Sequence, residues 1–264
     1  MRIIAGTLKS RRLAAPDFEG LRPTSDKLRE TLFNVIAPRV QGARVLDGFA
    51  GTGALGLEAL SRGAEHVTFV DDDRRAIALI GENVRRCGVA DRCVIIRGRL
   101  IEVSRRLEMA SFDLILLDPP YAASGAGCRG PRPSTSSGRS ERVEGRQRAA
   151  SWRGPQRAGV RVGVMWEQGP HDPNDAKDLA AVLTATAELL SRDGLVVLEH
   201  GRRREAPESA GRLARTRSLT SGDSVLTFYE RDPSAGSPTR QPRWGSRRAT
   251  ARAGHPEQVR GDGK

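Results

Sequence analysis

Residues 44–71 read RVLDGFAGTGALGLEALSRGAEHVTFVD, and this stretch decides the fold. Its two ends, residues 44–47 and 66–71, are short apolar runs of the kind found in buried strands. Between them a glycine-rich turn leads into an apolar helical pattern over residues 53–61. Two strands joined by a helix predict a parallel βαβ unit, so the stretch indicates an α/β protein.

The same alternation of strands and helices continues on both sides of this unit. A short hairpin is predicted over residues 2–4 and 12–14. Further helices are predicted over residues 26–36, 73–86, 101–109 and 175–190, and further strands over residues 93–97, 112–118, 194–199 and 225–230. The pattern therefore predicts one mostly parallel sheet.

The net charge of +12 is concentrated in two stretches that lack apolar periodicity. Residues 122–169 carry nine Arg against three Glu, and residues 231–264 carry eight basic against three acidic residues. We predict a disordered basic insertion over residues 122–170 and a disordered tail after residue 230. Residues 1–29, with seven basic and three acidic side chains, are better evidence of contact with nucleic acid.

Composition also bounds the chemistry and the compartment. The three cysteines, Cys87, Cys93 and Cys128, match no metal-ligand spacing, so we expect reduced thiols and no metal site. No apolar run approaches the roughly 18 residues of a membrane-spanning helix, and residues 1–10 lack the apolar core of a signal peptide. We expect a cytoplasmic monomer without membrane contact.

The turn after the first strand reads DGFAGTGALG and holds the first site candidates. Glycines permit a tight strand-to-helix turn and let the backbone approach a ligand. A dinucleotide-binding fold is the competing interpretation, but an acid before the glycines would repel a pyrophosphate. That acid suits the ammonium group of an amino-acid-like cofactor. The cofactor-binding candidates are Asp47, Phe49, Gly51, Gly53 and Gly56.

Three acids, Asp71, Asp72 and Asp73, end the second strand. A carboxylate there accepts hydrogen bonds from a ribose diol, which NAD and S-adenosylmethionine both contain. We assign ribose binding to Asp71. Asp73 is expected to cap the following helix.

The tetrapeptide Asp118-Pro119-Pro120-Tyr121 ends another apolar run. Two prolines cannot continue a ladder, so the strand stops at the edge where open α/β sheets bind ligands. A nucleobase amine is a weak nucleophile, and acceptors aimed at its hydrogens help it attack a methyl sulfonium. The Asp118 carboxylate and the Pro119 carbonyl are such acceptors, and Tyr121 can stack on the base. This group favours S-adenosylmethionine over NAD.

Four segments resemble the bacterial small-subunit rRNA guanine-N2 methyltransferases of the RsmD type. They are residues 2–6 (RIIAG), 22–34 (RPTSDKLRETLFN), 47–63 (DGFAGTGALGLEALSRG) and 118–121 (DPPY). The second and third segments are the most specific, because many amino-methyltransferases share DPPY. The resemblance spans roughly residues 1–121 and 172–230.

This resemblance implies a Rossmann-like class I methyltransferase fold. Such a fold has a mostly parallel, twisted sheet with helices on both faces and a last antiparallel strand, here with a short N-terminal hairpin. It implies S-adenosylmethionine as cofactor and a guanine N2 amine in 16S rRNA as acceptor, within an assembled or partly assembled 30S subunit. Asp118, Pro119, Pro120 and Tyr121 would form the catalytic group.

The family pattern also places RNA-facing side chains at Arg22, Thr24 and Arg29. Two positions depart from it. Asp71 stands where Glu is common, and Arg99 stands where an Asp usually lies near the adenine amine. An Arg cannot accept a hydrogen bond from that amine, so adenine binding either weakens or rests on the backbone.

The predicted organisation has five parts. They are an N-terminal hairpin and helix facing RNA (1–40), a cofactor-binding half (41–121), the basic insertion (122–170), a C-terminal half (171–230) and the basic tail (231–264). We interpret the insertion as a tolerated passenger, since surface loops absorb long insertions at little cost.

Two other functions stay open at this point. One is methyl transfer to adenine N6 in DNA, which uses the same DPPY chemistry. The other is a non-catalytic RNA-binding assembly factor that kept the fold but lost the cofactor through changes such as Arg99.

Overall fold

The computed structural model describes residues 1–16, 25–120, 161–164 and 178–234. The chain divides into two compact units, Met1–Pro233 and Ser234–Lys264, and only Ser234 of the second unit is described. Three predicted site residues, Arg22, Thr24 and Tyr121, lie outside the described residues, as does most of the predicted insertion and tail.

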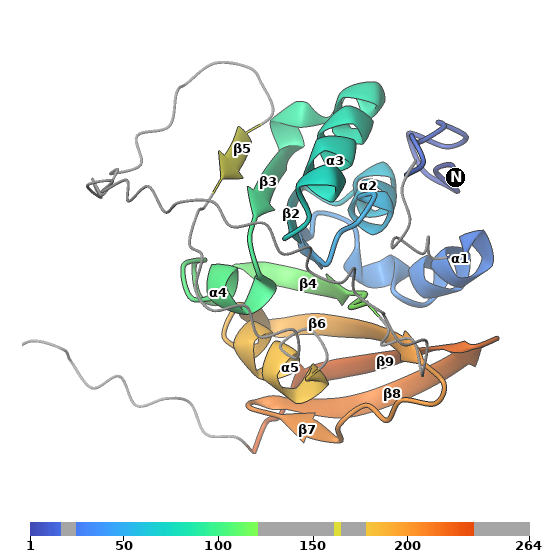
Figure 1. The fold of residues 1–264 in the computed structure, drawn as a ribbon. Helices are drawn as coiled ribbons and strands as arrows, with labels where there is room; N and C mark the ends of the chain where they lie inside the picture. The colour runs from blue at the N-terminus through green and yellow to red at the C-terminus, as the bar shows by residue number, and fades with distance from the viewer. Residues whose placement is uncertain (17–24, 121–160, 165–177, 235–264) are drawn as a thin grey trace, which may run out of the picture. The chain divides into compact units, whose positions relative to one another are not determined.

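The described strands form one nine-stranded sheet in the order β5-β3-β2-β1-β4-β6-β9-β8-β7 (Figure 1). The pairs from β5 to β6 are parallel, and the pairs beyond β6 are antiparallel. The strands are β1 (Arg44–Gly48), β2 (His66–Asp71), β3 (Cys93–Arg97), β4 (Phe112–Leu117), β5 (Arg161–Val164), β6 (Leu190–Gly201), β7 (Ser209–Ala210), β8 (Leu213–Ser221) and β9 (Ser224–Arg231). The predicted fold class is confirmed.

Helices cover both faces of this sheet (Figure 1). Side chains of α1, α2 and α3 share one apolar cluster with one face, and side chains of α4 and α5 share a second cluster with the other. The helices are α1 (Asp26–Val35), α2 (Ala54–Ser61), α3 (Arg74–Cys87), α4 (Leu100–Ser104) and α5 (Leu179–Ala187), with short 3-10 turns at Ala37–Arg39 and Ala90–Arg92.

The strand residues alternate between these two clusters. In β4, Leu114 and Leu116 belong to the first cluster, and Ile115 and Leu117 belong to the second. Because successive side chains of a strand point to opposite faces, this alternation fixes which face each later residue meets. The positions of side chains at the carboxyl ends of the strands follow from it.

Gly56 sets the distance between α2 and β2. A Cβ atom at this position would lie 2.4 Å from Cε1 of Phe69 and 2.7 Å from Cγ1 of Val67. Helix and strand therefore approach more closely than any other residue would allow. This close approach places the start of α2 directly behind the turn that follows β1.

The N-terminal segment folds back onto α2 as the predicted hairpin, with an antiparallel bridge between Arg2 and Arg12. The buried Glu58 carboxylate accepts hydrogen bonds from the backbone N–H groups of Ile4 (2.8 Å) and Ala5 (3.0 Å). It also accepts one from Nε of Arg62 (2.8 Å). A buried carboxylate thus anchors the hairpin to the core.

Side chains cap α1 and α3, and the cap at Asp73 is the one predicted above. Ser25 caps α1 by accepting from the N–H of Leu28, and Asp73 caps α3 by accepting from the N–H of Arg75. Both residues supply a side-chain oxygen to an N–H group that has no partner within the helix.

Several elements differ from the sequence-based expectation. Arg161–Val164 form β5 beside β3, inside the insertion predicted to be disordered. Helix α4 ends at Ser104 rather than Met109. Strands β7 and β8 were not predicted, because most side chains of β8 are exposed and its apolar residues do not alternate.

The first prediction concerns the contact at Gly56. We expect Gly56→Ala to destabilise the protein by about 1–3 kcal/mol, because the new methyl group overlaps the Phe69 ring. Gly81→Ala is the matched control, since no atom lies within 4 Å of the added Cβ in the middle of α3. That substitution should stabilise by roughly 0.5–1 kcal/mol. Urea unfolding measures both, and equal effects would contradict the packing role of Gly56.

The second prediction concerns the hairpin. Glu58→Ala leaves two backbone donors and Arg62 without their acceptor, and we expect a loss of about 2–4 kcal/mol. The amides of Ile4 and Ala5 should also exchange faster with solvent. Glu65→Ala, which removes an exposed carboxylate, serves as control. Unchanged amide exchange in Glu58→Ala would rule out the anchor.

Candidate active site

Four neighbouring strands end in acidic residues at one edge of the sheet. Asp47 and Asp71 lie at the carboxyl ends of β1 and β2, Asp118 follows β4, and Glu199 lies near the end of β6. By strand alternation all four belong to the face covered by α1, α2 and α3, because Val45, Phe69, Leu116 and Val197 precede them by two positions in that cluster. Carboxyl ends of parallel strands are where such sheets bind ligands.

Asp47 is almost fully buried and holds the start of α2. Its Oδ2 accepts a hydrogen bond from the N–H of Gly56 at 2.9 Å. Burial raises the pKa of Asp47 well above its ordinary value, the Gly56 hydrogen bond opposes this, and the charges of Asp118 and Asp71 raise the pKa further. A cation placed beside Asp47 would favour its ionised form.

Asp71 ties the glycine-rich turn to the end of β2. Its Oδ2 accepts from the N–H of Gly51 at 2.8 Å, and its Oδ1 accepts from the N–H of Asp73 at 2.9 Å. Burial raises the pKa of Asp71 to about 6, although both hydrogen bonds act to lower it. The Asp71 carboxylate thus stabilises the glycine-rich turn after β1 and also lies at the carboxyl-end edge of the sheet.

The turn itself has an unusual backbone. Phe49, Gly51 and Gly53 all have positive φ angles, of 61°, 55° and 75°. For glycine this conformation is easily reached, but for Phe49 it costs on the order of 1–3 kcal/mol. The conformation presents the half-buried Phe49 ring to a neighbouring recess.

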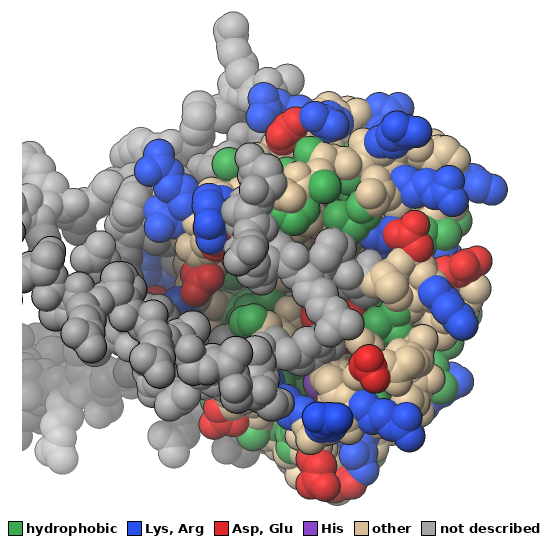
Figure 2. Space-filling view, turned by 45° about the vertical axis from the view of Figure 1, so that its right-hand side comes forward, with side chains coloured by type: hydrophobic (Ala, Val, Ile, Leu, Met, Phe, Trp, Pro, Cys, Tyr) green, Lys and Arg blue, Asp and Glu red, His purple; other side chains and the backbone are tan. Residues whose placement is uncertain are grey.

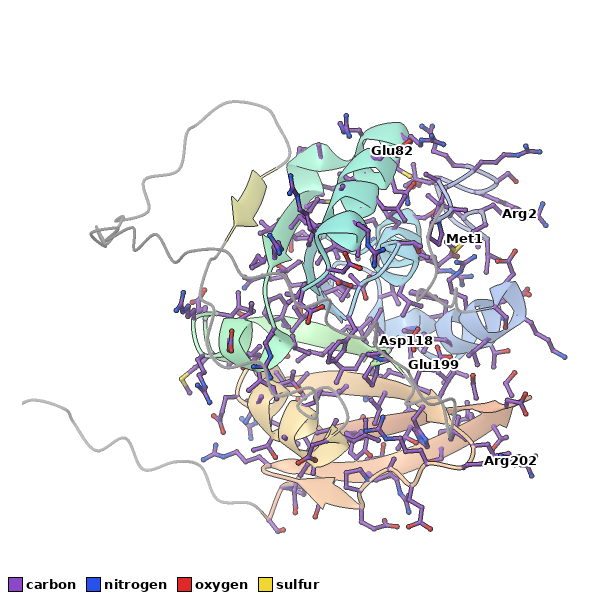
Figure 3. All side chains as sticks on the ribbon, in the orientation of Figure 1. Met1, Arg2, Glu82, Asp118, Glu199 and Arg202 are labelled. Carbon is purple, nitrogen blue, oxygen red and sulfur yellow. The ribbon has the colours of Figure 1, made fainter. Side chains whose placement is uncertain are left out.

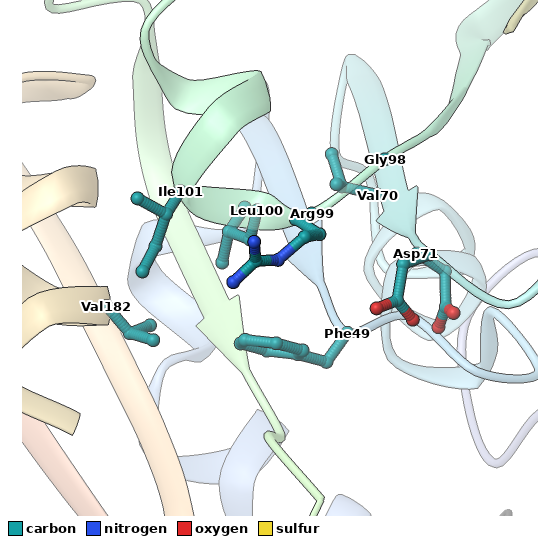
Figure 4. A pocket seen from close by; sticks show the side chains of 9 residues that line it. Phe49, Val70, Asp71, Gly98, Arg99, Leu100, Ile101 and Val182 are labelled. Carbon is teal, nitrogen blue, oxygen red and sulfur yellow. The ribbon is translucent and has the colours of Figure 1, made fainter. Parts of the chain in front are cut away.

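This recess opens to solvent at the same edge (Figure 4). In Figure 4 the Asp71 carboxylate lies on one side, Ile101 and Val182 lie on the other, and Phe49 and Arg99 lie between them. Its lining combines apolar side chains with a few charged groups, a mixture typical of small-molecule sites.

Asp72 and Leu100, which also line the recess, were not recognised from the sequence. Asp72 was named only among the three acids that end the second strand, and Leu100 lies just before the helix predicted over residues 101–109. Their positions in the sequence could have identified them, because Asp72 directly follows Asp71 and Leu100 directly follows Arg99. Gly56, in contrast, lies behind the turn and packs on β2.

The Asp118-Pro119-Pro120 segment ends β4 beside the turn. The N–H of Asp118 points to the carbonyl of Gly48 at 3.5 Å, a long contact. Asp118 is half-buried, Pro119 is buried and Pro120 is exposed. Asp118 is close enough to Asp47 to raise its pKa, so the predicted catalytic and cofactor-binding acids do come together.

Arg29 is placed differently from the prediction. Its side chain is fully buried, and Nη2 donates to the carbonyl of Arg2 (2.7 Å) and to Oδ1 of Asp26 (2.8 Å). Burial lowers the pKa of Arg29, and the charges of Asp26 and Glu58 partly offset this effect. A buried guanidinium cannot meet RNA at the surface, so Arg29 joins α1 to the hairpin instead.

Within the described residues, no helix is long and apolar enough to cross a membrane. No group of three His, Cys, Asp or Glu side chains there is placed to hold a metal ion. Cys87 and Cys93 are both buried and free, and burial raises the pKa of Cys93 to about 12.

The strand order, the antiparallel β9 and the acidic glycine turn together define a class I methyltransferase fold. The solved structure of the Escherichia coli protein yhhF shares this fold, with a TM-score of 0.60 and 24% identity. The alignment covers 88% of this chain and 98% of that one.

The chain belongs to the family described as Conserved hypothetical protein 95, the RsmD family, whose pattern matches residues 1–128. YlbH of Bacillus subtilis, provisionally named an rRNA methyltransferase, is 32% identical over 236 residues, covering 88% of this chain and 99% of that protein. Ribosomal RNA small subunit methyltransferase D of Haemophilus influenzae is 41% identical over 123 residues, covering 46% of this chain and 64% of that protein.

The third prediction follows from the raised pKa of Asp71. A carboxyl with a pKa of about 6 when folded, against about 3.9 when unfolded, binds more protons in the folded state between these values. Its contribution to stability is present below about pH 4 and is lost as the pH rises through 6. We expect the free energy of unfolding to fall more steeply between pH 4 and 6 in the wild-type protein than in Asp71→Asn.

The measurement is urea unfolding at several pH values. Asp91→Asn, at an exposed carboxyl, controls for the loss of one charge. Equal pH slopes in the wild-type protein and Asp71→Asn would contradict the raised pKa.

Proposed function

We propose that this protein is an S-adenosylmethionine-dependent methyltransferase that modifies the exocyclic N2 amine of a guanine in small-subunit rRNA. The observation that carries the proposal is the meeting of Asp47, Asp71 and Asp118 at one edge of a class I methyltransferase sheet. Family membership and the names of the curated relatives support it.

The side chains that line the recess suit the chemistry of the proposed cofactor. Phe49, Leu100 and Ile101 supply apolar walls for an adenine ring, and Asp71 lies where a ribose diol would sit. Asp47 would face the ammonium group, which favours the ionised form of its carboxyl. The cofactor would supply a methyl group on a cationic sulfur, and this acidic edge suits a cation.

Arg99 changes how the adenine is recognised. Its side chain carries only donors, and it lies 3.3 Å from Oε1 of Glu102 in an ion pair at the start of α4. An adenine amine would therefore find no acceptor in this side chain. We assign the recognition of the ring to stacking and apolar contact with Phe49, Leu100 and Ile101, without an acceptor from the side chain at position 99.

The acceptor amine would lie beside Asp118 and Pro119. The two prolines fix the backbone, so that the carboxylate and the Pro119 carbonyl can accept hydrogen bonds from the amine hydrogens. These bonds orient the nitrogen lone pair toward the methyl group, and alignment of this kind contributes much of the rate. Asp118 can then take the proton that the amine loses. Tyr121 is proposed to stack on the base.

The N-terminal hairpin offers the surface for RNA phosphates. Its exposed basic side chains are Arg2, Lys9, Arg11 and Arg12. Arg11 also donates to the carbonyl of Arg86, which brings the exposed Arg85 and Arg86 of α3 alongside. Figure 2 shows Lys and Arg side chains along the outer edge of one face of the molecule. Such contacts position RNA without reading its sequence.

We place the reaction in the cytoplasm, on an assembled or partly assembled small subunit, with the protein acting as a monomer. Methyl transfer to adenine N6 in DNA uses the same acceptor chemistry and is the alternative substrate. A non-catalytic assembly factor is the alternative from another class. Nucleoside analysis of rRNA and DNA incubated with the protein distinguishes the three functions, because the assembly factor would methylate neither.

The fourth prediction tests the role of Asp118. We expect Asp118→Asn to lower the rate of methyl transfer by about 10²–10⁴-fold, because the amine loses its charged acceptor. Cofactor affinity, measured by calorimetry, should change little. Asp113→Asn, at an exposed position of the same strand, is the matched control and should keep full activity.

The assay follows tritiated methyl transfer to small ribosomal subunits and to duplex DNA, with mass spectrometry of the nucleosides. N2-methylguanosine in rRNA is the expected product. Full activity of Asp118→Asn would refute the proposed role of Asp118. Methylated adenine in DNA would show that the substrate is DNA adenine and not rRNA guanine. Absence of cofactor binding at millimolar concentration would favour the assembly factor.

A further inference from the structure

We propose that Glu199 reads the Watson–Crick edge of the acceptor guanine and is the residue that selects guanine over adenine. This inference rests on the proposed function. It assigns specificity to a side chain that the sequence pattern placed only within a strand.

The first argument is position along the sheet. Strand β6 runs parallel to β4, and Leu198 is paired with Leu117. One residue further along each strand are Glu199 and Asp118, so the two acids leave adjacent strands at the same level. Adjacent strands lie about 4.8 Å apart. Figure 3 shows Asp118 and Glu199 next to one another.

The second argument is the face of the sheet. Leu195 and Val197 of β6 belong to the same apolar cluster as Leu114 and Leu116 of β4. Glu199 continues the first pair and Asp118 continues the second, so both point to one face. His200 points to the other face, where its Nε2 lies 2.9 Å from Oγ1 of Thr227.

The third argument is the direction of the Glu199 side chain. Its Oε1 accepts a hydrogen bond from Oγ of Ser224 at 3.1 Å. Ser224 is paired with Gly201, two residues beyond Glu199. The side chain therefore extends toward the carboxyl end of β6, on the side of this strand that faces β9. Glu199 as a whole is only 6% exposed, so an interaction with its side chain is shielded from water.

Guanine matches such a carboxylate in hydrogen-bonding chemistry. Its N1–H and one N2–H are neighbouring donors, and a carboxylate has two acceptor oxygens for them. The second N2–H stays available to Asp118. Adenine has an acceptor at N1, which would face the Glu199 carboxylate without a hydrogen bond. A site built around such a pair rejects the analogue that lacks the donor.

The test uses 2-aminopurine, which keeps the amine but carries an acceptor at N1. The target nucleotide is first mapped by mass spectrometry of rRNA methylated by the wild-type protein. Small subunits are then reconstituted from ligated rRNA with guanosine or 2-aminopurine at that position. The measured quantity is kcat/KM for tritiated methyl transfer to each substrate.

We expect the wild-type protein to prefer guanosine by on the order of 10²-fold or more. Glu199→Gln, whose amide can donate to N1 of 2-aminopurine, should reduce this preference at least tenfold while cofactor affinity stays unchanged. Glu199→Asp keeps the charge, and should retain the preference at a lower rate. Glu205→Gln, at an exposed glutamate, should match the wild-type protein on both substrates.

The outcomes separate the two claims. If the wild-type protein methylates guanine N2 and Glu199→Gln keeps the same preference, the assignment of Glu199 is wrong and the proposed function stands. If Glu199→Gln does not fold, a wild-type kcat/KM for guanosine in Glu199→Asp overturns the assignment, because a shorter carboxylate that reads the base must lower the rate. If the wild-type protein forms no N2-methylguanosine, both the function and the assignment fall.

Discussion

The hydrogen bonds that Asp47 and Asp71 accept from the turn after β1 are the constraint on which the rest of the site depends. They hold the N–H groups of Gly56 and Gly51, and so fix the start of α2 and the middle of the turn. Both carboxylates are buried to make these bonds, and burial raises the pKa of each. The order of the turn therefore requires several acidic groups close together in a region of low dielectric constant. A cationic ligand is stabilised in such a region.

Much of this arrangement was predictable, because it follows from local patterns. The apolar runs of β2 and β3 predict their bounds, residues 66–71 and 93–97, and the cap at Asp73 follows from its side chain. The burial of Arg29 was not predictable. It depends on the carbonyl of Arg2, which reaches α1 only when the N-terminal segment folds back. Strand β8 likewise depends on its pairing with β9, since its own residues carry no clear period.

The charge of the chain is divided between its surface and its interior. Exposed Arg and Lys side chains of the hairpin give the outside a positive field, which attracts a polyanion. The strand ends carry Asp47, Asp71, Asp118 and Glu199, which repel phosphate at close range. RNA held by its backbone on the hairpin would thus offer the acidic edge a base rather than a phosphate. The net charge of +12 alone does not show that basic residues lie on the surface and acidic residues at the strand ends.

The register of β6 against β4 determines which side chains of β6 lie at the proposed active site. Side chains alternate along β6, so a slip of one residue against β4 would bring His200 to the edge beside Asp118 and turn Glu199 toward the apolar cluster of α5. That cluster is made of apolar side chains, Val196 and Leu198 among them. Burying Glu199 there would cost several kcal/mol, as would exposing the leucines. The apolar pattern that stabilises the sheet therefore also decides which acid meets the base.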